Sequence, residues 1–380
     1  MKYIYSWIFI LTALSGQHLL ADMHGNCSPC EQDSCCETDC CEPCDFVPPC
    51  PPSDCAYNAP FIVDTKCDWG FFAGASFVYA QAIADGLRYA TTTITVSDGS
   101  SSEQFRVNYL RDFEYNPGFK VNLGYKLGCD NWIANVEYFR YHNTIAKDSF
   151  ELSNIETNSG FVLNILNNGS TQGISSGNFA ESASAKSSYR LNLDQLDFTL
   201  SRQYYVGRCL TVKPEAGLRL FWIDQSSTAS AVAPDFFVGQ ITTVSINESN
   251  SIWSVGPISN LSLDWNIWCN FRIVTSAGFG LLYYEQGANV SDSNFTPALD
   301  DLNNKVFDNK GKIKSVALHN SLMLGLGWSD YFCCNDWYLD LVIGYEFNRY
   351  DGNFRQAGSG DFTDLTIVLH GLVIDLKVAF

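Results

Sequence analysis

Cysteine is the residue type whose placement in this chain most suggests chemistry. The segments KLGCDNW (126–132), RCL (208–210), WCN (268–270) and FCCND (332–336) each put cysteine in a short turn between two patterned runs. In an oxidising compartment such thiols form disulfides, and as thiolates they bind metal. The candidate disulfide cysteines are Cys27, Cys30, Cys35, Cys36, Cys40, Cys41, Cys44, Cys50, Cys55, Cys67, Cys129, Cys209, Cys269, Cys333 and Cys334.

Ten of the 15 cysteines lie in one acidic, proline-rich segment, 22–67, and nine of these fall within 27–55. Such a segment cannot bury an apolar core, so we expect an extended arm ordered only by disulfides, metal or a partner. Three roles stay open for it: disulfides within the chain, disulfides to neighbouring molecules, and zinc binding that would use the CxxC pair Cys27 and Cys30. Because the cysteine count is odd, at least one thiol is free or pairs outside the chain.

Histidine offers little support for acid–base catalysis. Of the five His residues, His142 begins a predicted long loop and could pair with Asp148, whereas His319 lies within a predicted strand on its polar face. No motif places a serine or a second acid beside either of them. We therefore expect neither an enzyme nor a cofactor.

The bulk composition indicates an exported protein with a large core. The chain has 380 residues, a formal net charge of -18 and 46% hydrophobic residues. Lys2, the apolar run 4–14 and Ala21 predict a signal peptide over 1–21, which leaves the arm at 22–67 and a folded domain at 68–380. The acidic balance and the lack of a basic stripe argue against a nucleic-acid partner.

From residue 68 onward, apolar and polar residues alternate. In 119–127, Phe, Val, Leu, Tyr and Leu alternate with Lys, Asn, Gly and Lys, the pattern of a strand with one apolar face. Ten such runs are predicted as strands: 69–79, 119–127, 132–141, 189–202, 210–222, 252–267, 271–284, 314–328, 337–348 and 366–380. Their lengths match strands that cross a membrane at a tilt.

The connections between these runs alternate in length. Short ones such as 128–131 and 329–336 alternate with long ones such as 82–112, 143–187 and 225–250. Short periplasmic turns and long outer loops are typical of outer-membrane barrels. The predicted fold is therefore all-β: an antiparallel transmembrane β-barrel of about ten strands, or twelve if 87–96 and 105–110 add a hairpin. A soluble β-sandwich is the alternative.

The barrel topology then places the side chains. The terminal Phe380 on an alternating last strand resembles an outer-membrane assembly signal, and all the candidate cysteines fall at the periplasmic end. The candidate lumen-facing residues are Lys120, Lys126, Asn135, Glu137, Asp197, Lys213, Glu215, Arg219, Asp264, Arg272, His319, Asp340, Glu346, Asp375 and Lys377. Residues of both charge signs could line a weakly selective pore, or they could pair across a narrow barrel and fill it.

Three stretches of the sequence resemble one bacterial family. They are DWGFFAGASFVYAQAIADGLRYA (68–90), FEYNPGFKVNLGYKLGCDNWIANVEY (113–138) and LNLDQLDFTLSRQYYVGRCLTVKPEAGLRLFWIDQ (191–225). Their PGF-x-x-x-LGY and GLR-x-x-WIDQ motifs are similar to those of the Legionella-type major outer membrane proteins, also found in chlamydia-related bacteria. The resemblance implies a pore-forming outer-membrane barrel, and in chlamydia-like envelopes disulfide cross-linking. The cysteine-rich arm is not among the shared motifs.

These observations lead to one expected function and two alternatives. The expectation is a porin-like channel for small hydrophilic solutes in the outer membrane of a Gram-negative bacterium, with the arm and short turns in the periplasm. Its expected partners are outer-membrane lipid, the solutes, and either itself or other cysteine-rich envelope proteins through disulfides. The alternatives are a structural, cross-linked envelope protein with a filled barrel, and a surface adhesin that uses long loops such as 154–188.

Overall fold

The computed structural model of the protein describes most of the predicted barrel domain. The described residues are 59–60, 63, 70–84, 88–97, 102–127, 132–153, 159–167, 170–176, 182–206, 209–234, 241–268, 270–295, 306–332, 336–352 and 365–379. The predicted signal peptide, most of the predicted arm, Phe380 and every candidate cysteine except Cys209 lie outside them. No helix among the described residues is long and apolar enough to cross a membrane.

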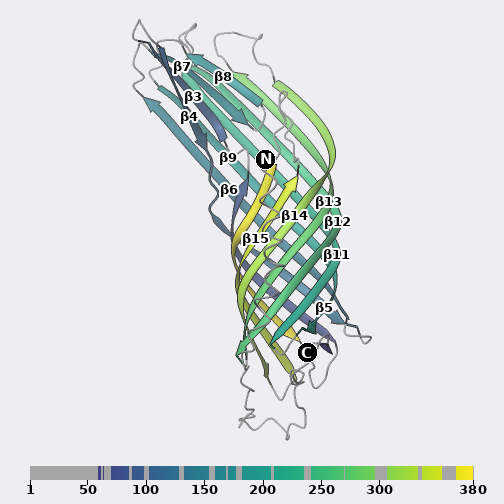
Figure 1. The fold of residues 1–380 in the computed structure, drawn as a ribbon. Helices are drawn as coiled ribbons and strands as arrows, with labels where there is room; N and C mark the ends of the chain where they lie inside the picture. Colours follow the sequence, from purple (N-terminus) through teal and green to yellow (C-terminus); the bar gives the residue numbers. More distant parts are fainter. Residues whose placement is uncertain are drawn as a thin grey trace.

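Ten strands close into one antiparallel barrel (Figure 1). They are β2 (Phe71–Ala84), β5 (Tyr115–Lys126), β6 (Trp132–Ser153), β9 (Ser182–Arg202), β11 (Leu210–Pro234), β12 (Ile241–Trp268), β13 (Phe271–Phe295), β14 (Val306–Phe332), β15 (Trp337–Gly352) and β16 (Leu365–Ala379). Each pairs with the next along the chain, β9 pairs with β11, and β16 returns to β2. The predicted ten-stranded barrel is confirmed.

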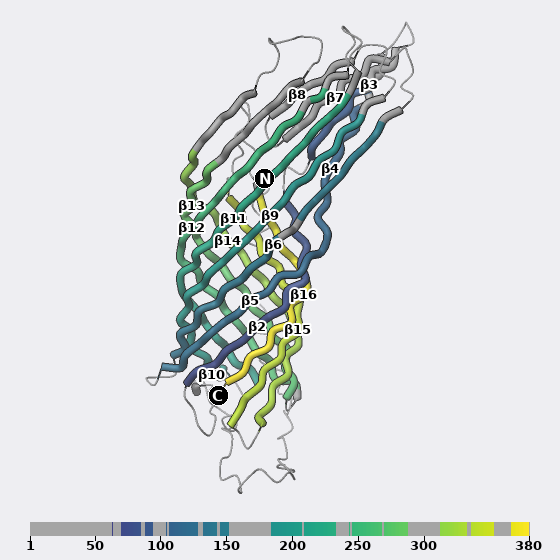
Figure 2. Tube along the Cα trace, turned by 180° about the vertical axis from the view of Figure 1, so that it is seen from behind, coloured from purple at the N-terminus to yellow at the C-terminus, as the bar shows by residue number. Residues whose placement is uncertain are grey.

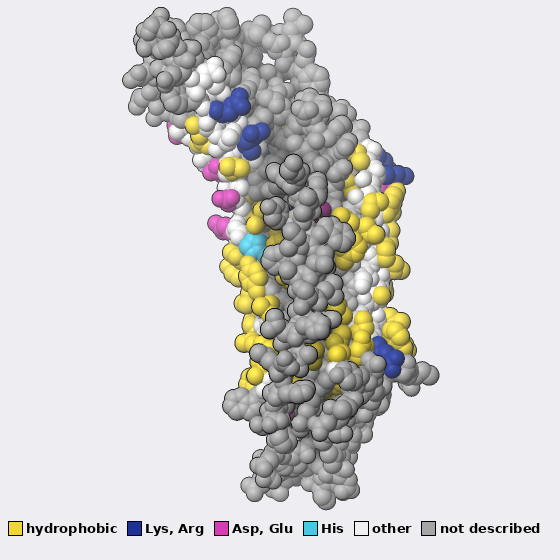
Figure 3. Space-filling view, in the orientation of Figure 1, with side chains coloured by type: hydrophobic (Ala, Val, Ile, Leu, Met, Phe, Trp, Pro, Cys, Tyr) yellow, Lys and Arg dark blue, Asp and Glu magenta, His cyan; other side chains and the backbone are white. Residues whose placement is uncertain are grey.

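The outer face of the barrel carries an apolar band between two rows of aromatic side chains. One row, near the short turns, includes Trp132, Trp265, Phe271, Phe332 and Trp337. The other, which we call the outer girdle, consists of the exposed Tyr79, Tyr115, Trp222, Trp253, Tyr283 and Tyr345. On the face shown in Figure 3, hydrophobic side chains cover the barrel wall and most of the visible charged side chains lie above them.

The spacing of the two aromatic rows fits a membrane. Trp253 and Trp265 lie twelve residues apart on β12 and both face outward. At about 3.4 Å per residue and a tilt of 35–45°, they are separated by roughly 30 Å along the membrane normal. The hydrocarbon core of a bilayer has about this thickness.

Several predicted loops are in fact strand. β11 and β12 pair continuously from Leu210↔Trp265 to Pro234↔Ile241, so the predicted connection 225–250 is wrong in extent. β13 and β14 likewise pair as far as Ser293↔Val306. These strands of 25 to 28 residues continue well beyond the apolar band. In the outer halves of these strands, both faces are polar. These halves therefore lack the alternation of apolar and polar residues that predicted the halves nearer the short turns.

The two longest predicted loops form a second sheet of four strands. β3 (Arg88–Ser97) and β4 (Ser102–Leu110) come from the first loop, and β7 (Ser159–Asn167) and β8 (Ser170–Ser176) from the second. Their order is β4-β3-β7-β8, at the end opposite the short turns (Figure 1). The possible extra hairpin at 87–96 and 105–110 therefore forms, but in this second sheet and not in the barrel wall, so it does not make twelve barrel strands. The predicted flexible loop 154–188 is largely strand.

This second sheet packs against the outward extension of the barrel. β7 and β8 contact β11 and β12. On β4, the ring of Tyr109 stacks on Phe150 of β6 with centroids 3.7 Å apart. The sheet therefore covers the barrel at the end away from the short turns.

At the short-turn end, the chain before the barrel docks on the rim. β1 (Ala59–Pro60) pairs antiparallel with β10 (Tyr204–Tyr205), which in turn pairs with β11. β10 lies in the predicted short turn 203–209. The end of the predicted arm and the short turns thus lie together, near the C-terminal end of β16 (Figure 2).

Candidate functional site

The inward face of the barrel carries a belt of charged side chains that pair across the interior. Lys120 on β5 donates to Glu346 on β15, with Nζ 2.7 Å from both carboxylate oxygens. Because β2 and β16 separate these two strands in the wall, the pair spans the lumen. The ammonium group also lies 5.4 Å from the ring centre of Phe139.

A second ion pair lies at the end of the belt that is farther from the short turns. Arg219 binds Asp197 with two hydrogen bonds, of 2.8 Å from Nε and 2.7 Å from a terminal nitrogen. Its other terminal nitrogen lies 2.9–3.0 Å from the ring nitrogens of His319. This bidentate geometry is the strong form of an arginine–carboxylate pair. His319 is thus held by a cation and by Asn348, 3.4 Å away.

A third group lies nearer the short turns. Arg272 contacts the carboxylates of Asp340 and Asp264, and its side chain lies across Gly327 on the neighbouring strand. A Cβ atom at Gly327 would lie 2.9 Å from the Arg272 side chain. A side chain at this position would therefore require Arg272 to shift from its place on the strand.

The remaining predicted lumen residues occupy the same inward faces. Lys377 lies 2.8 Å from Asp375, and Lys213 lies 3.6 Å from Glu215. Glu137 and Asn135 on β6 alternate with exposed outward residues, and Lys126 ends β5. The structure thus brings most of the predicted lumen charges together as opposite-sign pairs.

Exposure to water differs among the members of the belt. The side chain of Lys377 is 38% exposed and that of Lys213 is 29% exposed. Those of Arg272, Arg219 and Asp197 are 8–10% exposed. The two lysines are therefore the belt cations in best contact with water.

Beyond Arg219 the interior is filled by what we call the apolar layer. Its members are Ala80, Ala82, Phe113, Phe139, Tyr141, Leu191, Leu193, Phe221, Ile223, Ile252, Leu282, Tyr284, Ala317, Tyr350, Ile367 and Leu369. Each is 3% exposed or less. They come from every barrel strand except β5, whose place is taken by Phe113 in the segment just before it.

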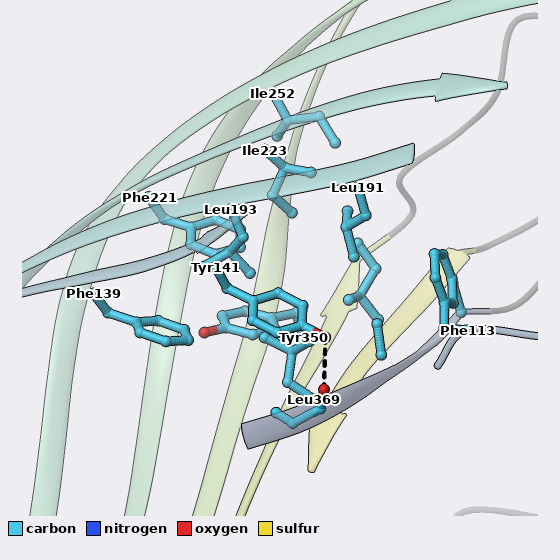
Figure 4. Close-up of a cluster of buried hydrophobic side chains, with 14 of the residues drawn as sticks. Phe113, Phe139, Tyr141, Leu191, Leu193, Phe221, Ile223, Ile252, Tyr350 and Leu369 are labelled. Carbon is cyan, nitrogen blue, oxygen red and sulfur yellow. Dashed lines mark hydrogen bonds between the residues drawn. The ribbon is translucent and has the colours of Figure 1, made fainter. Parts of the chain in front are cut away.

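Side chains from opposite walls meet in the apolar layer (Figure 4). The rings of Phe221 on β11 and Tyr350 on β15 stack with centroids 4.5 Å apart. The Tyr350 hydroxyl donates to Gln195 Oε1 on β9 at 2.8 Å, and the Tyr141 hydroxyl donates to the carbonyl of Ala80 at 2.8 Å. These contacts join strands that are not neighbours in the wall, so the side chains of the layer cross the interior of the barrel.

The chain segment between β4 and β5 closes the layer from the outer side. Phe113 packs edge-on against Tyr189, with ring centroids 5.5 Å apart. Arg111 is 1% exposed. Its guanidinium lies 5.7 Å from the ring of Tyr89 and 5.8 Å from that of Tyr189, and it donates to Ser227 Oγ at 2.9 Å. A buried arginine thus holds this segment inside the barrel mouth.

Sequence reasoning missed the apolar layer. Residues of the layer lie on the same strand faces as the predicted polar residues. Phe221 and Ile223 follow Arg219 at alternate positions, and Leu191 and Leu193 precede Asp197 in the same way. The available signal was a short stretch with apolar residues on both faces, such as LFWI at 220–223 or LLYY at 281–284. In a barrel wall, such a stretch indicates an interior that is apolar as well as the lipid face.

The two residues considered for acid–base chemistry, His142 and Asp148, have other partners. His142 Nε2 lies 2.6 Å from Asp194 Oδ2, and its other ring nitrogen lies 3.2 Å from Arg140. Asp148 instead accepts a hydrogen bond of 3.0 Å from the Tyr89 hydroxyl. The possible His142–Asp148 pair therefore does not form. Among the described residues, no three His, Cys, Asp or Glu side chains are grouped as metal ligands.

One candidate cysteine can be placed. Cys209 precedes β11 beside the β1–β10 pair and is disulfide-bonded. It is the one cysteine among the described residues, so its partner lies outside them.

Comparison with known proteins identifies the family. The model of the Legionella pneumophila major outer membrane protein precursor family matches residues 63–380. The chain belongs to this family. The resemblance inferred from the sequence motifs is thus confirmed, and the chain is an outer-membrane protein. No curated protein matches this chain.

Some solved outer-membrane barrels are distantly similar. The outer membrane protease OmpT from Escherichia coli is 11% identical, with 83% of this chain and 98% of that chain covered and a TM-score of 0.40. The Pseudomonas putida toluene transporter TodX is 9% identical, with 82% and 90% covered and a TM-score of 0.22. At these scores the likeness says nothing about the function of this chain.

The Arg219–Asp197 pair generates a stability prediction. Arg219→Met should destabilise the barrel by about 3–5 kcal/mol, because it leaves the Asp197 carboxylate buried without its cation. The double variant Arg219→Met/Asp197→Leu should recover most of that loss, because neither charge remains. Urea unfolding in lipid vesicles measures both. Equal losses in the single and double variants would contradict the pairing.

Proposed function

We propose that this major outer membrane protein is a structural envelope protein with a barrel closed to hydrophilic solutes. Its short-turn end faces the periplasm, where its cysteines form disulfides with its own arm or with neighbouring molecules. The observation that carries the proposal is the apolar layer, which crosses the interior at the level of the outer girdle.

A hydrated solute finds no continuous polar path through the barrel. A porin conducts because polar side chains line a water-filled path along its whole length. Here the charged belt supplies such a lining only from the short turns to Arg219. A hydrated solute would next have to displace the stacked Phe221 and Tyr350, and shed its water among side chains that are 3% exposed or less. The porin-like channel expected from the sequence needs this layer to open.

The contacts at the short-turn end support an anchoring role. β1 fixes the end of the predicted arm to β10, and the disulfide of Cys209 lies at the same rim. Cysteines at 129, 269, 333 and 334 occupy the other short turns in the sequence. On the proposed topology these cysteines would share one rim with Cys209, on the side where the periplasm permits disulfides.

Conductance tests the closed interior. The purified full-length protein in a planar bilayer should give no discrete current steps, because the apolar layer excludes water. The triple variant Tyr141→Ala/Phe221→Ala/Tyr350→Ala should give steps, since it removes the large rings of the layer.

Trp222→Ala is the matched control for this measurement. Trp222 neighbours Phe221 on β11 but faces lipid, so its removal should leave the bilayer silent. Regular steps from the unaltered protein would overturn the closed barrel and favour the porin. Silence from a correctly folded triple variant would show that the layer is not the barrier.

The disulfides can be tested separately. Cys209→Ser should change the pattern of oxidised species on non-reducing gels of native envelopes, either by loss of a high-mass band or by altered monomer mobility, because one bridge at the rim is lost. Thr211→Ser at the same rim is the control. A banding pattern identical to that of the unaltered protein would remove Cys209 from the anchoring proposal.

A further inference from the structure

Three exposed cations surround one serine on the outer face of β6 and β9. Lys147 on β6 lies opposite Ser188 on β9. Lys186 and Arg190 flank Ser188 on the same outward face of β9, so each is a diagonal neighbour of Lys147. Diagonal neighbours across a strand pair have Cα atoms about 7–8 Å apart, within reach of long side chains. We call Lys147, Lys186 and Arg190 the basic triangle. β6 and β9 run side by side in Figure 2.

The basic triangle concentrates positive charge with little compensation. None of its three side chains makes a hydrogen bond or ion pair with another described residue. The nearest acids on the same face are Glu151, diagonal to Lys186, and Asp224, diagonal to Arg190. Like charges at such spacing repel each other. The arrangement is therefore favourable when an anion lies between the three cations.

The neighbouring strand offers hydroxyl groups at the same place. On β11, Ser226 lies opposite Arg190, Thr228 opposite Ser188 and Ser230 opposite Lys186. These outward hydroxyls, with Ser188, can donate hydrogen bonds to an anion held by the basic triangle. Three cations bordered by hydroxyls match the charge and the acceptor-rich chemistry of a phosphate group.

The height of the basic triangle on the barrel indicates where the anion comes from. Ser226, opposite Arg190, lies four residues beyond Trp222 of the outer girdle, and Ser230, opposite Lys186, lies eight residues beyond it. Four and eight residues of a tilted strand rise on the order of 10 and 20 Å. The triangle therefore begins just outside the hydrocarbon, where lipid headgroups lie, and its long basic side chains can reach back toward that boundary.

We propose that the basic triangle binds the phosphate groups of anionic lipid headgroups in the leaflet at the outer girdle. It would fix the height and rotation of the barrel in that leaflet, on the side that carries the second sheet. The proposal rests on the membrane orientation given under the proposed function, but not on whether the barrel conducts.

Binding of a phosphorylated lipid tests it. The full-length protein in neutral detergent is titrated with diphosphoryl lipid A and, in parallel, with the same glycolipid lacking phosphates, and lipid adducts are counted by native mass spectrometry. The unaltered protein should bind the phosphorylated lipid far more tightly. Lys147→Gln/Lys186→Gln/Arg190→Gln should weaken that binding on the order of a hundredfold, given the usual contribution of each basic residue near an anionic surface.

Two controls test whether the binding depends on these three cations in particular and on a lipid as the source of the phosphate. Lys312→Gln/Lys314→Gln removes two other exposed cations, both of which contact Glu285, and should leave the affinity within a few-fold. Inorganic phosphate at the same concentration should not compete, because it lacks acyl chains that pack beside the girdle. The proposal fails if the triple variant binds as the unaltered protein does, if both glycolipids bind equally, or if free phosphate competes fully. Because the assay needs no bilayer current, its outcome is independent of the conductance result.

Discussion

The hydrogen-bonding needs of the backbone in lipid determine this structure. Hydrocarbon offers no partner to an N–H or C=O group, so a sheet that crosses it must have no free edge within it. The β9–β11 and β16–β2 pairings close the sheet and meet that need. Closure in turn requires one apolar face toward lipid, bounded by the two aromatic rows, and confines every polar inward side chain to a narrow interior.

The narrow interior explains how the charges and the apolar layer are arranged. Charged groups inside a lipid-embedded barrel are stable when each has a partner nearby, as Lys120 has in Glu346 and Arg219 in Asp197. Toward the outer end, rings and aliphatic side chains replace the charges and fill the lumen. A barrel of about this size lets side chains from opposite walls touch, which the Phe221–Tyr350 stack requires.

The strand segments that face lipid could be predicted from the sequence, but little of the rest of the structure could. The period of two in 119–127 or 210–222 predicted strands because lipid demands a continuous apolar face. Above the outer girdle that demand ends, so the outer halves of β11 and β12 were mistaken for a loop. The pairing of Arg219 with Asp197 depends on the register between β9 and β11, which alternation alone does not fix. The inward-facing Phe221 and Ile223 were not recognised as part of an apolar interior, because their neighbours in the sequence face lipid and are apolar as well.

Water contact along the inward face of β11 tests the closed interior most directly. In the full-length protein reconstituted in lipid, water-edited solid-state NMR compares how fast magnetisation passes from water to each side chain. We predict rapid transfer to Lys213 and Glu215, near the short turns, and almost none to Phe221 and Ile223 in the apolar layer. Transfer to Ile223 as fast as to Lys213 would mean that water fills the barrel at that level, and would contradict the account.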